Sequence, residues 1–386
     1  MEENTNNIEM QFEVQNQESL IDVEIEQIDT VVGLMEKPFD PTKINIETKT
    51  PSLDTLIRRI KNKTIQLNTE SYFQRKDDLW DIVKQSRLIE SILIQFPLPA
   101  FFFDATDDEN WLVVDGLQRL SSIRNFCVEK RLKLMNLEFL THFNGYVWDD
   151  LPGNLQTRIE ESQVVIYKIM PGTPTDVKFN IFKRINTGGL TLEPQEIRHA
   201  LFQGKPANFI ADLAKTSEFL QATRNKIQTH RMLDRDFANR FLCFYLLGYE
   251  NYQSDLDTYM SKAMASIDNK PDEEIQKIAN DFKAAMKLSW KIFGDEAFRK
   301  VYREYDRLPP INKALFDAIA TQFALLSNDE RQRLEREGIL FKDLLKNKLN
   351  EDSSFFISIT SSTGDKNRIV KRHELIKELI QQTLSV

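Results

Sequence analysis

Residues 111–123, with the sequence WLVVDGLQRLSSI, decide how we interpret the first half of the chain. The apolar run Leu112–Val114 is typical of a buried strand, and the pair Asp115-Gly116 ends that strand at once. Beyond the break, apolar residues recur at helical spacing: Leu120, Ile123 and Cys127. The stretch therefore predicts a strand, a tight glycine turn and a helix.

Three polar residues of this stretch, Asp115, Gln118 and Arg119, fall on the turn or on the first helical turn. Free backbone N–H groups at a helix start favour an anion, and an arginine with an amide is suited to hold a phosphate. Asp-Gly is also a common turn, and an arginine after it is commonly solvated. The stretch alone leaves both interpretations open.

The composition is that of an ordinary globular protein of 386 residues, with 41% hydrophobic and 28% charged residues. A net charge of −8 argues against coating nucleic acid through bulk charge, although a local basic groove remains compatible with it. Two cysteines, Cys127 and Cys243, are too few for a disulfide framework, so we expect a cytoplasmic setting. No signal peptide is visible and the apolar runs are too short for a membrane span.

The chain is expected to have three parts. Residues 1–48 are rich in acidic and amide side chains and predict a flexible arm, with one segment that docks. Residues 49–205 mix helical and strand patterns, and residues 206–386 show helical periodicity without a confident strand. We therefore predict an α+β domain followed by an all-α domain.

The individual elements follow from periodicity and from Pro and Gly signals. In the first half we expect helices over 53–60, 80–96, 175–185 and 194–204, and strands over 64–67, 100–103, 112–114 and 164–169. The strands over 100–103 and 112–114 are expected to pair as a hairpin. In the second half we expect helices over 209–219, 237–247, 256–264, 275–293, 311–324, 334–349 and 368–384, with 353–365 as a polar stretch rich in Ser and Thr.

Several familiar catalytic motifs are absent from the sequence. The four histidines are scattered without metal-ligand spacing, and neither a Walker-type loop nor a GxGxxG fingerprint occurs. What remains is three polar or glycine-rich turns in the first half: Phe73-Gln74-Arg75, Asp115-Gly116-Leu117-Gln118-Arg119 and Phe182-Lys183-Arg184-Ile185-Asn186-Thr187-Gly188-Gly189. If they met at one sheet edge they would form a phosphate cradle, whereas three unrelated solvated turns are the alternative.

Together, several motifs resemble a known family. In chain order they are Tyr72-Phe73-Gln74-Arg75 with Trp80, residues 85–92, Pro97-Leu98-Pro99, residues 114–120 and residues 182–189. Their order and spacing over residues 51–204 resemble the N-terminal domain of GmrSD-type restriction proteins, within the ParB/sulfiredoxin-like superfamily. Residues 231–237 likewise resemble the helical part that follows in many members.

This resemblance implies a fold and a function. The fold would be a ParB/sulfiredoxin-like domain with a small mixed sheet, followed by a helical domain. The function would be a nucleotide-binding, nucleotide-hydrolysing sensor or regulatory component of a DNA restriction or phage-defence system. The alternatives are an inactive ParB-like module that recruits DNA or an effector protein, and a ParB-like enzyme that nicks DNA itself.

The resemblance also implies roles for particular residues. Asp115, Gln118 and Arg119 are the expected catalytic residues, and the expected nucleotide contacts are Gln74, Arg75, Gly116, Arg119, Arg184, Asn186, Thr187 and Gly188. Asp115 either holds Mg²⁺ or fixes Arg119 through a salt bridge. The expected ligand is ATP, GTP or CTP, with DNA and a separate nuclease or effector as further candidate partners and the oligomeric state left open.

The sequence departs from the family pattern in two places. Leu117 stands where the family motif has its first glutamine, which weakens hydrolysis if that side chain touches nucleotide and changes nothing if it faces the core. The second half contains only His230 and His373 and no His-Asn-His cluster. We therefore expect no HNH nuclease site in this chain.

Overall fold

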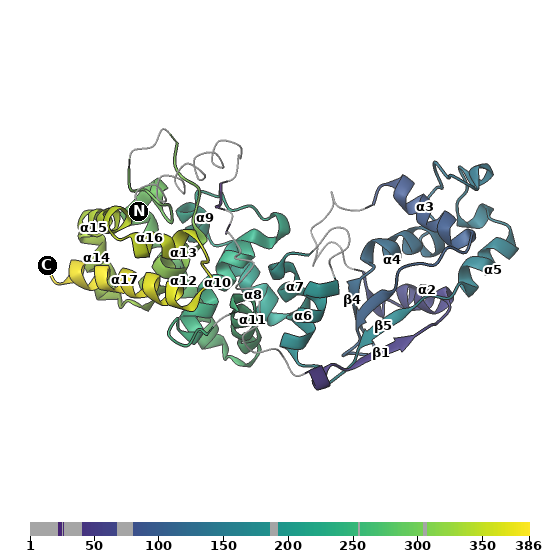
Figure 1. Cartoon of the computed structure of the whole chain (residues 1–386), viewed down its shortest axis with the longest axis horizontal. Helices are drawn as coiled ribbons and strands as arrows, with labels where there is room; N and C mark the ends of the chain where they lie inside the picture. The colour runs from purple at the N-terminus through teal and green to yellow at the C-terminus, as the bar shows by residue number, and fades with distance from the viewer. Residues whose placement is uncertain are drawn as a thin grey trace. The chain divides into compact units, whose positions relative to one another are not determined.

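The chain forms two compact units in the computed structural model (Figure 1). Residues 37–203 make up the first, here called the sheet unit, and residues 1–36 with 204–386 make up the second, here called the helical unit. The structure describes residues 22–24, 26, 41–67, 80–185, 192–253, 255–303 and 307–386. The chain thus begins in the helical unit, builds the sheet unit, and returns.

The sheet unit is built on five short strands in the order β1-β5-β3-β4-β2. Their bounds are β1 Ile46–Lys49, β2 Ile65–Gln66, β3 Phe101–Asp104, β4 Trp111–Asp115 and β5 Ile166–Ile169. β3 and β4 pair antiparallel, as do β1 and β5, whereas β2 runs parallel to β4 and β3 parallel to β5. The predicted hairpin and small mixed sheet are confirmed, and β1 is a strand that the sequence analysis missed.

Helices cover both faces of this sheet. They are α2 Leu53–Lys61, α3 Ile82–Leu93, α4 Leu117–Ile123, α5 Gly153–Glu161, α6 Thr175–Ile185 and α7 Pro194–Leu201. Trp111 and Val113 of β4 pack with α2, α3, α4 and α5 in one core, while Leu112 and Val114 pack with α6 and α7 in another. Figure 1 shows α6 and α7 on the opposite side of β4 from α3 and α4. Because β4 is covered on both faces, its apolar run lacks the alternation of a half-exposed strand.

Glu90 fixes α3 to the loop that follows α4. Its buried carboxylate accepts the backbone N–H groups of Glu138, Phe139 and Leu140, at 3.0, 2.7 and 2.7 Å. Burial acts to raise the pKa of Glu90, but these three hydrogen bonds outweigh burial and lower it. The carboxylate therefore stays ionised and holds the backbone of residues 138–140 in place.

The helical unit contains α helices throughout its described residues after 204. They are α8 Lys205–Ala214, α9 Ser217–Ala222, α10 Leu233–Leu247, α11 Leu256–Ser266, α12 Asp272–Phe293, α13 Lys313–Leu325, α14 Asn328–Arg336, α15 Gly338–Glu351, α16 Ser353–Thr360 and α17 Lys366–Leu384. None of the described helices has both the length and the apolar character needed to cross a membrane. The predicted α+β fold with a helical second half is confirmed.

Three segments of the helical unit differ from the sequence prediction. The helix expected over 334–349 is divided at Glu337, where α14 ends and α15 begins. The helix expected over 209–219 is divided into α8 and α9 by Lys215 and Thr216. The Ser/Thr-rich stretch contains α16, whose start is capped by Asp352 accepting the backbone N–H of Phe355 at 2.9 Å. That cap and the burial of Phe355 and Ile359 stabilise a helix despite the weak helical propensity of Ser and Thr.

His373 on α17 is a buried histidine of this core. Its ring stacks on Tyr249, with centroids 4.7 Å apart and planes 8° apart, and lies 4.9 Å from the ring centroid of Phe244. Burial, together with the neighbouring charge of Arg372, holds the pKa of His373 well below its usual range. The folded chain therefore keeps this imidazole neutral.

We predict that His373→Phe will flatten the acid side of the stability profile. The folded-state pKa of His373 lies below the unfolded value of about 6.5, so its contribution is complete above that pH and is lost as the pH falls below it. The loss amounts to about 1.4 kcal/mol per pH unit in the wild type. Urea midpoints between pH 7.5 and 5.5 measure it.

His230→Phe serves as the control, because it removes an exposed histidine of the same unit. It should keep the wild-type slope of stability against pH. An unchanged slope in His373→Phe would contradict the assignment.

Candidate functional site

Gly116 makes the turn between β4 and α4. Its φ of +97° lies in the left-handed region, and its carbonyl accepts the backbone N–H of Leu120 at 2.9 Å to begin the helix. A Cβ added here would lie 2.5 Å from Cδ1 of Phe101 and 3.3 Å from Nη2 of Arg119. Both the backbone angle and the lack of space therefore require glycine.

Arg119 is buried beneath this turn, with 10% of its side chain exposed. Nη2 lies 2.8 Å from Oδ2 of Asp115 and 3.2 Å from the carbonyl oxygen of Ala100, and Nη1 donates to the carbonyl of Pro99. The guanidinium carbon lies 4.6 Å from the ring centroid of Phe101. Arg119 thus ties the start of β3 to α4.

Burial and Asp115 act in opposite directions on Arg119. Desolvation lowers the pKa of the guanidinium and exceeds the raising effect of the Asp115 carboxylate. Asp115 keeps 30% of its side chain exposed, so one face of the carboxylate meets solvent. Two roles were expected for Asp115, and the structure shows one of them, the salt bridge to Arg119.

Gln118 holds the backbone of Trp80. Its Oε1 accepts the Trp80 N–H at 3.0 Å, while Nε2 of Gln85 donates to the Trp80 carbonyl at 2.6 Å. Oε1 of Gln85 in turn accepts from Nδ2 of Asn125 at 2.9 Å. Both backbone groups of Trp80 are thereby fixed by amides from α3 and α4.

Leu117 packs between the two cores of the sheet unit. Its half-buried side chain contacts apolar residues of both faces of the sheet. Leu117 is therefore accommodated by apolar packing at this position.

The C-terminal end of α6 lies against the core that contains Leu112 and Val114. Ile185 packs there together with Leu117, and Arg184 beside it is exposed. Lys178, further back on α6, fixes the helix to the sheet through a salt bridge of 2.8 Å to Asp104 at the end of β3. Sequence analysis missed this pair, although an Asp at a strand end and a Lys on a helical polar face are the signal that would suggest it.

Five of the predicted site residues lie outside the described part of the chain: Gln74, Arg75, Asn186, Thr187 and Gly188. The described residues that flank them can still be placed. Gln66 of β2 pairs with Leu112 of β4, and Trp80 is held by Gln118. Ile185 and Leu192, on either side of residues 186–191, pack against the same core as Leu117.

The described side chains around the β4–α4 turn offer few ligands for a metal ion. Within the described ranges, no group of three or more His, Cys, Asp or Glu side chains is placed to hold a metal. Asp115 would be a single carboxylate ligand, and one of its oxygens is engaged by Arg119. That arrangement fits Mg²⁺ only when most ligands are waters and substrate phosphates, which is the usual way Mg²⁺ is bound with nucleotides.

A cavity of about 480 Å³ lies elsewhere in the sheet unit. It is lined by residues of α2, the end of α3, the following Pro97-Leu98 segment and α5, among them Phe96 and Arg158. Phe96 is 57% exposed and meets Phe139, 65% exposed, edge to face at 6.4 Å. Neither Asp115 nor Arg119 lines this cavity.

These features define an α+β domain organised around a strand, an Asp-Gly turn and a helix. Residues 53–203 match the family described as GmrSD restriction endonuclease, N-terminal domain. The match confirms the predicted domain family for the sheet unit, and a GmrSD N-terminal domain implies a component of a restriction or phage-defence system. Searches of curated proteins and of solved structures found no match to the chain.

We predict that Gly116→Ala will destabilise the sheet unit by about 2–4 kcal/mol, combining backbone strain with the clash against Phe101. The matched control is Gly172→Ala, since Gly172 has a similar φ of +90° and nothing within 4 Å of an added Cβ. It should lose only the strain contribution of about 1–2 kcal/mol. Equal losses in thermal melts of the two variants would contradict the role assigned to Phe101.

We predict that Arg119→Met will cost about 3–5 kcal/mol, because it leaves a carboxylate and two carbonyls without their buried cation. Asp115→Asn should lose less, since its side chain is partly exposed. Chemical denaturation compares the two, and an Arg119→Met protein as stable as the wild type would show that the ties to Pro99 and Ala100 are dispensable.

Proposed function

We propose that this chain is the nucleoside triphosphate-binding component of its defence system, with the phosphates held beside the Asp115–Arg119 turn. The ligand is ATP, GTP or CTP with Mg²⁺, and the activity is hydrolysis of the phosphoric anhydride. Phosphoryl transfer depends mainly on positioning and on charge stabilisation, so it needs no covalent nucleophile.

One observation supports this proposal: described residues next to the other two polar turns contact the β4–α4 turn or the apolar core that Leu117 contacts. The segment with Gln74 and Arg75 ends at Trp80, which is hydrogen-bonded to Gln118. The segment 186–191 begins and ends at residues that pack against the core of Leu117. These attachments support a shared ligand site beside the β4–α4 turn.

The roles we assign differ from those of a simple three-arginine cradle. Arg119 already donates to a carboxylate and two carbonyls, so it supports the turn and orients Asp115. The exposed Arg184, with Arg75, is proposed to contact the phosphates. Gln118 positions Trp80, and Asp115 is proposed to hold Mg²⁺ through water.

A second candidate is a binding module without catalysis, and three observations favour it. The guanidinium of Arg119 is engaged internally, and Leu117 replaces a polar residue of the family motif. The exposed pair Phe96 and Phe139 offers an aromatic contact for a partner at a separate cavity. In this alternative the chain recruits DNA or an effector protein.

The test is nucleotide binding measured by calorimetry and thermal melts with ATP, GTP and CTP, with and without Mg²⁺. At 100 times Kd a ligand stabilises the fold by about 2.7 kcal/mol, which a melt detects readily. Arg184→Ala should weaken binding about 10- to 100-fold, the value of one charge-assisted hydrogen bond. Phosphate release then reports hydrolysis.

Arg58→Ala is the matched control, because Arg58 is an exposed arginine of the same unit that forms a salt bridge of 2.9 Å with Asp54 on its own helix. It should bind nucleotide as the wild type does. No stabilisation by any nucleotide would remove the proposed function and favour the binding module.

A further inference from the structure

A short piece of the N-terminal segment is part of the helical unit. Val23 pairs in parallel with Ile311, which also forms an antiparallel bridge with Arg299. The Glu24 N–H donates to the Ile311 carbonyl at 2.8 Å, and the Ile311 N–H donates to the Asp22 carbonyl at 2.9 Å. Val23 is buried. The segment thus adds a parallel bridge to a unit whose described elements are otherwise helices and one antiparallel bridge.

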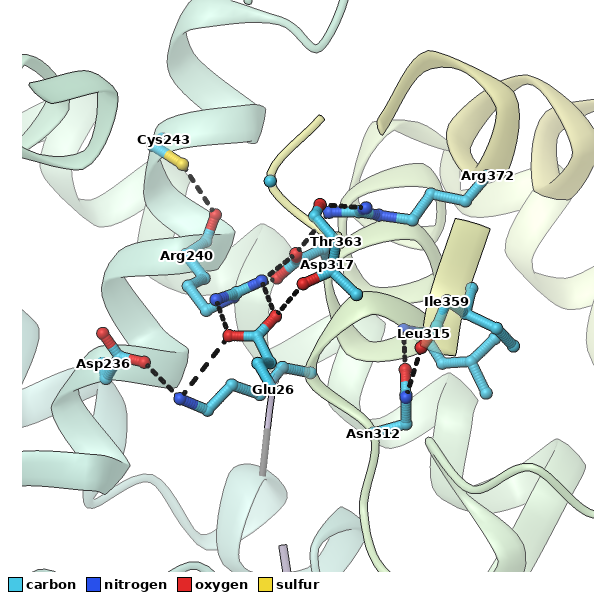
Figure 2. A network of polar contacts seen from close by, with 12 residues as sticks. Glu26, Asp236, Arg240, Cys243, Asn312, Leu315, Asp317, Ile359, Thr363 and Arg372 are labelled. Carbon is cyan, nitrogen blue, oxygen red and sulfur yellow. Dashed lines mark hydrogen bonds and ion pairs between the residues drawn. The ribbon is translucent and has the colours of Figure 1, made fainter. Parts of the chain in front are cut away.

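Glu26 enters a group of buried cations (Figure 2). Its two carboxylate oxygens lie 2.9 and 3.0 Å from Nη1 and Nη2 of Arg240, a bidentate pair. Thr363 donates its hydroxyl at 2.6 Å, and Nζ of Lys313 lies 3.9 Å away. Although burial acts to raise the pKa of Glu26, these partners lower it, so the carboxylate is ionised.

Glu24 has its own pair of donors. Nζ of Lys300 lies 2.8 Å from Oε1, and Nδ2 of Asn312 donates to Oε2 at 3.0 Å. Asn312 is fixed in turn, because its Oδ1 caps α13 by accepting the Leu315 N–H at 2.8 Å. Glu24 and Glu26 thus both place their carboxylates against donors of the helical unit, while Val23 is buried.

Glu26 adds a carboxylate to a buried group of charges. In that group Arg240 and Arg372 both bind Asp317, at 2.7 and 3.0 Å, and Lys313 lies 3.2 Å from Asp236. Arg240 uses its second pair of contacts for Glu26, so Glu26 joins α10 to the N-terminal segment.

We propose that the helical unit carries a binding site for an extended acidic peptide with glutamates at alternating positions, occupied by the chain's own residues 22–26 as an exchangeable strand. Backbone pairing with Ile311 gives the peptide its direction, and the cations select its side chains. Strand addition with alternating side-chain contacts is a common mode of peptide recognition. The site is distinct from the sheet unit and does not depend on the nucleotide proposal.

Cutting the connection between the segment and the sheet unit tests the exchange. A specific protease site inserted between Gly33 and Leu34 of the full chain allows cleavage after folding. A labelled synthetic peptide of residues 18–30 should then replace the cleaved fragment, as followed by fluorescence anisotropy. The uncleaved chain should bind this peptide far more weakly, because its own segment competes at an effective concentration of about millimolar.

Two peptide variants distinguish specific recognition of Glu24 and Glu26 from attraction by the net charge of the peptide. A peptide with Glu24→Gln and Glu26→Gln should bind the cleaved chain at least about 100-fold more weakly, since two charge-assisted contacts are lost. A peptide with Glu18→Gln and Asp29→Asn has the same net charge and should bind as the wild-type peptide does. Equal binding of both variants, or a fragment that never exchanges, would overturn the proposal.

Hydrogen exchange on the intact chain provides a second measurement that does not require cleavage. The N–H groups of Glu24 and Ile311 should exchange faster than those in the middle of α13, because an exchangeable strand opens without unfolding the helices. Rates as slow as those of α13 would mean that the segment is a permanent part of the core, and would equally overturn the proposal.

Discussion

A single buried guanidinium holds the sheet unit together at its candidate site. Arg119 joins Asp115, one turn earlier in the chain, to the carbonyls of Pro99 and Ala100 at the start of β3. A buried charge is tolerated only when its donors are satisfied, so the turn, the helix and the hairpin must take one arrangement. Gly116 is part of the same constraint, since a larger residue would meet both Phe101 and Arg119.

The helical unit also contains buried arginines that are neutralised by carboxylates, and one of these carboxylates comes from the N-terminal segment. Asp317 lies inside α13, and two arginines from α10 and α17 neutralise it. Arg240 needs a second carboxylate, which comes from Glu26, more than 200 residues earlier in the sequence. In both units, therefore, a buried arginine determines which distant segments come together, and hydrophobic burial provides the bulk of the stability.

Elements that depend on interactions between neighbouring residues were predicted correctly, whereas elements that depend on contacts distant in the sequence were missed. The strand at 111–115, its hairpin partner and the helices with strong periodicity depend on local pattern, and the sequence was sufficient for them. β1 was missed because its residues, IETK, are mostly exposed and only pairing with β5 makes them a strand. α16 was missed because its cap and its buried Phe355 matter only when a core is present to pack against.

The sequence by itself determined the class of fold and the Asp-Gly turn, because turn chemistry and apolar spacing are properties of neighbouring residues. The family of residues 53–203 followed from the resemblance of several motifs to a known domain. Only the tertiary structure decided what the polar side chains do. It placed Arg119 inward against backbone carbonyls, packed Leu117 between two cores, and brought Glu24 and Glu26 to the cations of the helical unit. Those outcomes depend on which side chains come together inside the folded protein, and the spacing of residues along the chain does not specify this.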